Sequence, residues 1–194
     1  MRKTDRRVEK TRKLIIDAFT DLILENDFKK ITIKSIAEKA NINRKTFYLH
    51  YSSIDDILFD FSLDLTDTIL DELVKNDFFK TQGEEFSLDI LIRVISNIVL
   101  KNYDLAKKLI INDSYHFFTR EIKDLVKETF IIRLKNRVSL SEYKMNIIGD
   151  FIASGFGKLL KDWFIDPGDL SIEDIARLAS SLIYQGLRGI NNDI

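Results

Sequence analysis

The chain has 194 residues, of which 45% are hydrophobic, 31 are acidic and 30 are basic, and it contains no cysteine. This composition can bury a core, and it excludes disulfides, thiolate catalysis and zinc–thiolate sites. Seven glycines and one proline are too few turn residues for a β-rich fold, so helices are favoured. Because there is no signal-like N-terminus and no membrane-length apolar run, we expect a soluble, cytoplasmic protein without a membrane partner.

The formal net charge of −1 conceals an uneven distribution along the chain. Residues 1–51 hold 13 Lys and Arg against 7 Asp and Glu, a net charge of +6, whereas the remaining residues carry a net charge of −7. A basic segment followed by an acidic one is typical of a phosphate-binding module joined to a module that binds no nucleic acid. Short stretches of any sequence also fluctuate in charge, so the charge distribution alone does not show that this segment binds nucleic acid.

Apolar residues recur at helical spacing along most of the chain, which predicts an all-α fold of about nine helices. The first helix is basic in its first half, where cations oppose the helix dipole, so a phosphate backbone is an obvious partner for its cations Arg6, Arg7, Lys10, Arg12 and Lys13. The predicted helices span about 4–26, 33–40, 44–50, 53–76, 87–102, 104–112, 117–137, 141–165 and 171–190.

Residues 33–50 predict a helix-turn-helix, with Thr32 and Asn43 capping two short helices. On the second helix, Phe47 and Tyr51 share a face that can pack inward, which leaves Tyr48 and the cations outside. A helix this short needs neighbours to hold it, as a docked recognition helix does. Arg and Lys donors suit guanine edges, whereas hydroxyls and helix-start N–H groups suit phosphate oxygens.

These residues resemble the DNA-binding region of the TetR family of bacterial transcriptional regulators over 12–60. The resemblance implies a three-helix head, residues 1–52, and a helical body, residues 53–194. Because the sequence contains no flexible linker, we expect the two to be fused rigidly through the long helix that starts near Ser53. It also implies a homodimer that binds a palindromic operator, usually as a repressor, and that a small ligand releases. The match lies in Ile15, Ala18-Phe19, Leu22, Phe28, Ile31-Thr32-Ile33, Ile36-Ala37, Ala40-Asn41-Ile42-Asn43, Thr46-Phe47-Tyr48-Leu49-His50-Tyr51, Asp55 and Ile57-Leu58. The residues implied in DNA binding are Thr32, Lys34, Asn43, Arg44, Lys45, Thr46, Tyr48 and His50.

The chain departs from the family pattern at four positions. Asn26 and Asn41 stand where the family usually has Gly, which Asn can replace because it tolerates left-handed geometry. Lys45 brings a long cation where a small residue is frequent, and this is expected to alter sequence preference. Ile54 stands where a Lys commonly touches phosphate, so one backbone contact is expected to be missing.

The last two helices are the predicted dimer interface. Both are apolar over a wide surface and rich in small residues, and such a surface needs either a partner chain or the protein's own core. Residues 151–163 also resemble the bodies of a TetR subgroup that includes regulators of dihydroxyacetone metabolism. The interface residues expected are Phe151, Gly155, Phe156, Leu159, Leu178, Leu182 and Gly186.

A ligand pocket would have to come from the middle helices, where Tyr103, His116, Phe117 and Trp163 could line a mostly apolar site. Core packing is the alternative for each of these rings. No metal-ligand spacing, phosphate loop or nucleophile motif occurs, so we expect no cofactor, no metal and no enzymatic activity. The alternative function is a helical interaction module that works through an effector protein rather than a small ligand.

Overall fold

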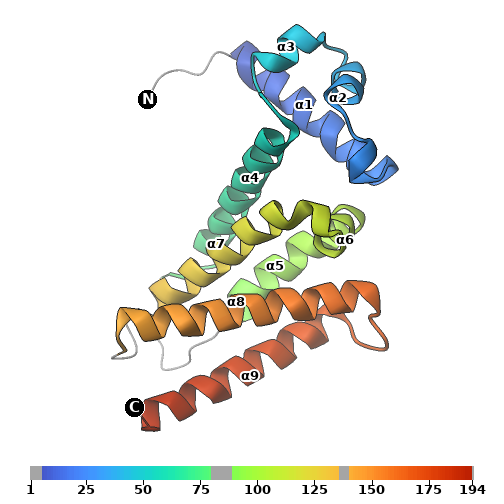
Figure 1. Cartoon of the computed structure of the whole chain (residues 1–194). Helices are drawn as coiled ribbons and strands as arrows, with labels where there is room; N and C mark the ends of the chain where they lie inside the picture. The colour runs from blue at the N-terminus through green and yellow to red at the C-terminus, as the bar shows by residue number, and fades with distance from the viewer. Residues whose placement is uncertain (1–5, 80–88, 136–139, 194) are drawn as a thin grey trace. The chain divides into compact units, whose positions relative to one another are not determined.

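A computed structural model describes residues 6–79, 89–135 and 140–193, apart from the side chains of residues 89, 117, 133, 134 and 188–193. Within these ranges the chain forms nine α-helices and no strand, which confirms the predicted all-α class (Figure 1). Their bounds are α1 (Arg6–Glu25), α2 (Ile33–Lys39), α3 (Arg44–Tyr48), α4 (Ile54–Lys75), α5 (Asp89–Lys101), α6 (Tyr103–Ile111), α7 (His116–Lys135), α8 (Glu142–Ile165) and α9 (Ile172–Asp193), with 3₁₀ turns η1 (Phe28–Lys30) and η2 (Asp113–Tyr115).

The chain forms two compact units, Met1–Asp64 and Leu65–Ile194, which we call the head and the body. Helix α4 contributes its first half to the head and its second half to the body. The division after residue 52 that the sequence suggests stays a prediction, because it would assign all of α4 to the body.

The head is built on the apolar face of α1. Ile15, Phe19 and Ile23 are completely buried there, and Ile36 of α2 is buried with them. Helix α2 contacts both α1 and α3. Since burying one such side chain stabilises a fold by about 1.5–3 kcal/mol, this face holds the two short helices in place.

Reciprocal hydrogen bonds begin two helices of the head. The Ser35 N–H donates to Thr32 Oγ1 at 3.1 Å, and the Thr32 N–H donates to Ser35 Oγ at 2.9 Å. At the start of α4, the Asp56 N–H donates to Ser53 Oγ, and the Ser53 N–H donates to Asp56 Oδ2, both at 3.1 Å. These capping boxes satisfy N–H groups that the helices leave unpaired, so they set where α2 and α4 start.

The turn between α2 and α3 depends on Asn41, which has a φ of 53°. The Ile42 N–H donates to Ala37 O at 3.0 Å and the Asn41 N–H to Glu38 O at 3.1 Å, which is the Schellman arrangement of a helix end. The expectation that Asn41 substitutes for a left-handed Gly is therefore confirmed. Asn26 does not have a positive φ; its side-chain amide instead donates to Leu22 O.

Substitution of Asn41 tests this conformation. We expect Asn41→Ala to destabilise the head by about 1 kcal/mol and Asn41→Gly to leave it unchanged or more stable, because alanine is disfavoured at positive φ. Amide hydrogen exchange of the head measures the effect. Asn97→Ala on the exposed face of α5 is the control and should change stability by less than about 0.5 kcal/mol. Equal stability of the alanine and glycine variants would contradict the expectation.

The body packs as pairs of helices, with α7 against α8 and α9 against both α5 and α8. Phe78, Phe130 and Phe164 are completely buried in its core. Gly149 brings α8 close to α7, because a Cβ at this position would lie 3.2 Å from Ile131 Cδ1. Charged residues interrupt all of these helices, and within the described ranges none could cross a bilayer.

Candidate nucleic-acid interface

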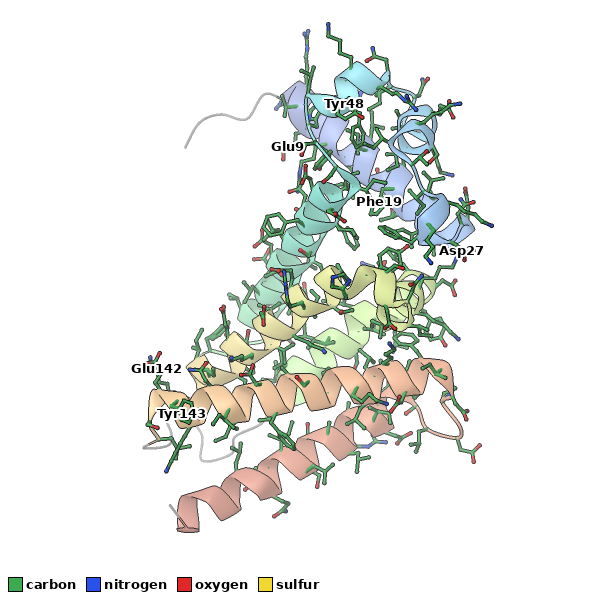
Figure 2. The ribbon with its side chains drawn as sticks, in the orientation of Figure 1. Glu9, Phe19, Asp27, Tyr48, Glu142 and Tyr143 are labelled. Atoms are coloured by element: carbon green, nitrogen blue, oxygen red, sulfur yellow. The ribbon has the colours of Figure 1, made fainter. Side chains whose placement is uncertain are left out.

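Seven of the eight residues that the sequence assigns to DNA lie on α2, on α3 or at the two positions that precede these helices, and the eighth, His50, lies two residues after α3. Lys34, Arg44 and Lys45 are exposed, and 57% of Tyr48 is exposed on α3 (Figure 2). The recognition helix is shorter than the predicted 44–50. It ends at Tyr48, because the His50 N–H donates to Phe47 O at 2.9 Å in a tight turn instead of continuing the α-helical pattern.

Two aromatic side chains hold this five-residue helix on the head. Phe47 is completely buried and Tyr51 is 6% exposed, with their ring centroids 6.1 Å apart. Phe47 also meets the ring of Tyr48 edge-on at 5.7 Å. The inward-facing pair that the sequence predicts is confirmed, and it leaves the opposite face of α3 open to a partner.

Asn43 and Thr46 form the first turn of α3. Asn43 Oδ1 accepts from the Thr46 N–H at 2.7 Å and from the Thr46 hydroxyl at 3.0 Å. The side-chain carbonyl of Asn43 is therefore already used to cap α3, as the Thr32 hydroxyl is used to cap α2. Because the Thr46 proton is used locally, the hydroxyl oxygen of Thr46 is left with acceptor capacity rather than with a donor for phosphate.

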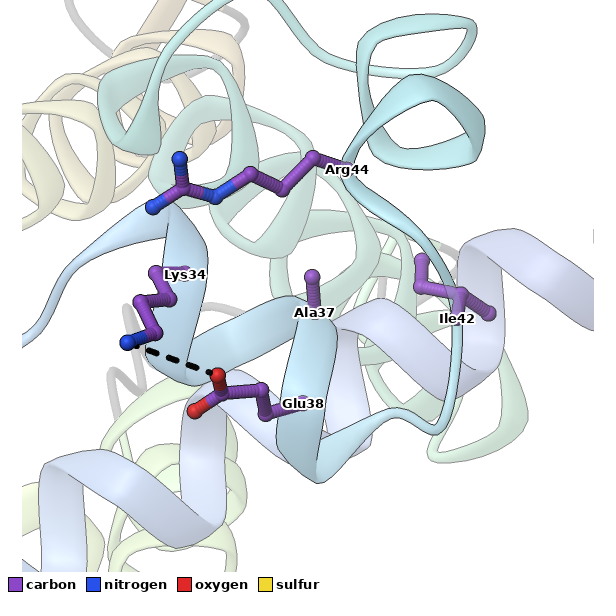
Figure 3. A pocket seen from close by; sticks show the side chains of 5 residues that line it. All are labelled: Lys34, Ala37, Glu38, Ile42 and Arg44. Carbon is purple, nitrogen blue, oxygen red and sulfur yellow. Dashed lines mark ion pairs between the residues drawn. The ribbon is translucent and has the colours of Figure 1, made fainter.

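An open hollow of about 420 Å³ lies beside the turn between the two helices. Figure 3 shows Arg44 extending from the start of α3 above α2, where Lys34 and Glu38 pair across one turn with Nζ and Oε1 3.8 Å apart. Ala37 and Ile42 complete the lining. Glu38 is not among the residues predicted to bind DNA, although its i, i+4 spacing from Lys34 is a signal of this pairing in the sequence. The Glu38 carboxylate offsets the positive charge of Lys34 beside this hollow.

Arg12 of α1 has partners that its basic surroundings do not predict. Its guanidinium pairs with Asp60 and, at 2.8 Å, with Asp64 Oδ1, both on α4, and a phosphate contact of Arg12 stays a prediction. The hydrogen bond from Arg12 holds the pKa of Asp60 below its ordinary value. Tyr51 donates to the same carboxylate, and burial together with this acceptor raises the pKa of Tyr51. Lys10 and Lys13 remain exposed on α1.

Two of the four residues expected around a ligand are in contact in the body. The rings of Tyr103 and Trp163 lie edge to face with centroids 6.0 Å apart, and Trp163 Nε1 donates to Leu170 O at 2.8 Å. His116 is exposed, with Nδ1 3.2 Å from Asp113 O. The side chain of Phe117 lies outside the described residues. The pocket therefore stays a prediction.

The residues expected at a dimer interface divide into two groups on α8 and α9. Phe151, Leu178 and Leu182 are 78%, 47% and 62% exposed. Gly155 and Gly186 are exposed as well, and a Cβ at either would meet open space. By contrast, the half-buried Phe156 and Leu159 pack against the body's own core. Ile147 and Tyr143, which are not among the predicted interface residues, are also exposed hydrophobic side chains of α8.

The fold and the exposed cationic helix define a helix-turn-helix transcriptional regulator. Residues 15–61 match the model of the tetR family of bacterial regulatory proteins, and residues 87–185 match the model of a transcriptional regulator C-terminal region of the same family. These two regions cover most of the head and most of the body. The chain belongs to the TetR family.

Two relatives and one solved structure extend this result. The chain is 34% identical over 107 residues to the HTH-type transcriptional regulator YxbF of Bacillus subtilis, which covers 53% of this chain but only 28% of YxbF. It is 29% identical over 164 residues to DhaS of Lactococcus lactis, an activator of the dhaKLM operon, covering 82% of each protein. The fold matches FadR of Thermus thermophilus, a repressor solved with lauroyl-CoA, with a TM-score of 0.68, 18% identity, and 91% and 94% coverage.

Proposed function

We propose that this regulator binds a palindromic operator as a homodimer and reads it with the exposed face of α3. The observation that carries the proposal is the position of Arg44, Lys45 and Tyr48 on a short helix whose other face is fixed by buried Phe47. Arg and Lys can donate to guanine O6 and N7 in the major groove, which distinguishes one base pair from another.

The remaining side chains of the interface would hold the DNA backbone. Lys34 provides a cation at the first turn of α2, and Tyr48 and His50 follow the base-reading residues along the chain. Contacts of this kind position a protein on the duplex without reading its sequence. Thr32 and Asn43 act through the helix starts that they cap, because helix N-termini attract phosphate.

Homodimerisation through α8 and α9 is the second part of the proposal. The exposed Phe151 and Leu182, with Gly155 and Gly186, give a surface that a second copy could cover at close range. A two-fold dimer would present two recognition helices to half-sites about 34–36 Å apart or a multiple of this distance.

Control by a small molecule bound in the body is the third part. FadR is a regulator of the same fold that was solved with lauroyl-CoA, which supports a small-molecule ligand for this fold. Helix α4 supplies residues to both units, so a ligand that favours one position of α4 can change the operator affinity. Such a ligand must bind the two states with different affinity. Repression is the family expectation, whereas DhaS is an activator, and a reporter gene behind the operator decides between them.

A mobility-shift assay with the DNA upstream of the protein's own gene tests the DNA-binding proposal. We expect wild type to retard this fragment in low salt and Lys45→Ala with Tyr48→Ala to weaken binding by about 100-fold, since each lost contact costs about 1–3 kcal/mol. Lys101→Ala, which removes an exposed cation of the body, should bind as wild type does. No retardation by wild type, or equal binding by the double variant, would favour an interaction module instead.

A further inference from the structure

One carboxylate in the head joins three separate segments of the chain. Asp60 Oδ2, on α4, accepts from the Tyr51 hydroxyl at 2.5 Å and also from Arg12 Nε of α1. A second guanidinium nitrogen of Arg12 donates to Asp64 Oδ1, one turn further along α4. Tyr51 lies three residues after the end of α3 and is hydrogen-bonded to Phe47 O of that helix, so α1, the segment that ends the recognition helix and α4 meet at this group.

Tyr51 connects this carboxylate to the DNA-facing surface. The Tyr51 N–H donates to Phe47 O at 3.0 Å, and the two rings are in contact. Phe47 in turn contacts the ring of Tyr48, which is exposed on α3. Two ring contacts therefore link the Asp60 carboxylate to a side chain of the proposed interface.

Asp60 contacts Arg12 and Tyr51 through hydrogen bonds, and hydrogen bonds restrict the orientation of the groups that they join. Arg12 and Asp60 are only 29% and 25% exposed, so both charges are partly removed from water. Hydrogen bonds to charged partners are short and strong, and a guanidinium has a fixed planar geometry. An apolar contact would tolerate small rotations of α3, whereas this arrangement fixes the position of Tyr51 relative to α4.

We propose that Asp60 is a positioning residue that sets the orientation of the recognition helix relative to α4, with Arg12 and Tyr51 as its two partners. This rests on the proposed function, because orientation matters only if α3 binds DNA. A displacement of α4 then carries Tyr51 and Arg12 with it, and the operator affinity changes while the cationic surface keeps its charge.

The test compares operator DNA with a scrambled fragment for Tyr51→Phe, Asp60→Asn and the double variant of the full chain. Tyr51→Phe removes one hydroxyl and no charge. It is expected to weaken operator binding by about 5- to 10-fold, the worth of one hydrogen bond, and to leave binding to scrambled DNA unchanged. The double variant should lose no more operator selectivity than Asp60→Asn alone, to within about twofold, since both changes break one network.

Two matched controls separate positioning from charge and from stability. Asp67→Asn makes the same charge change on an exposed position of α4, and Tyr143→Phe removes the hydroxyl of an exposed tyrosine of α8. Both should keep the wild-type ratio of operator to scrambled affinity. A loss of folded protein alone would lower both affinities equally, so a change in their ratio reports orientation.

The backbone amide resonances of residues 44–50 provide a readout without DNA. They should shift in Tyr51→Phe and Asp60→Asn and stay in place in the two controls. If wild type binds no DNA, the proposed function fails, and these shifts still decide whether Asp60 positions α3. Unshifted amides in Tyr51→Phe would overturn the proposal. If wild type binds the operator, an operator-to-scrambled affinity ratio in Tyr51→Phe equal to that of wild type would also overturn it. If Asp60→Asn does not fold, Tyr51→Phe is sufficient.

Discussion

Replacement of Phe47 by alanine is expected to destabilise the head by about 3–5 kcal/mol, which is the range found when a large aromatic is removed from a packed core. Phe47 is completely buried and contacts both Tyr48 and Tyr51. Helix α3 has five residues, far fewer than a helix needs to be stable alone, so its order depends on this anchor. Urea unfolding with hydrogen exchange of α2 and α3 amides measures the loss.

Leu49→Ala is the matched control for this substitution. Leu49 comes two residues later and is 78% exposed, so its truncation should change stability by less than about 0.5 kcal/mol. Operator binding should fall sharply in Phe47→Ala, because the exposed side chains of α3 lose their support. A destabilisation below about 1 kcal/mol, or full protection of the α3 amides, would mean that other contacts hold the helix.

Phe151→Glu combined with Leu182→Glu is expected to convert the protein from a dimer to a monomer. The two side chains are the most exposed of the apolar residues assigned to the dimer interface, so the substitutions should leave the fold of each chain unchanged. Burying four carboxylates without partners in a two-fold interface would cost far more than the contacts contribute. Sedimentation or light scattering at micromolar concentration measures the change.

Operator affinity should fall about 100-fold or more in this monomer, because the two half-sites are no longer bound by linked heads. Leu100→Glu, at a 43% exposed position of α5, provides the control and should remain dimeric. A dimeric double variant would place the interface elsewhere on the body. A monomeric wild type would remove dimerisation from the proposal.

The local features of the head could be predicted from the sequence because their causes are local. The caps at Thr32 and Asn43 join residues only three positions apart, and the inward pair Phe47 and Tyr51 follows from helical periodicity. The end of α3 was placed two residues too late, since a helix and a hydrogen-bonded turn differ little in sequence pattern.

Long-range pairing could not be predicted in this way. The partners of Arg12 lie 48 and 52 residues away, so its basic surroundings on α1 suggested phosphate instead. On α8, apolar residues occur on more than one face, and periodicity alone did not separate core-facing Phe156 from exposed Phe151. Only the packing of α8 against α7 and α9 decides which face is covered.

The central claim is that the exposed face of α3 reads an operator. Anisotropy titrations of the labelled upstream fragment and of a scrambled fragment, at several salt concentrations, test it most directly. We expect the upstream fragment to bind about 10³-fold or more tightly, and log K for both fragments to fall linearly with log salt as phosphate contacts are lost. Equal affinity for the two fragments, or affinity that does not depend on salt, would contradict the claim.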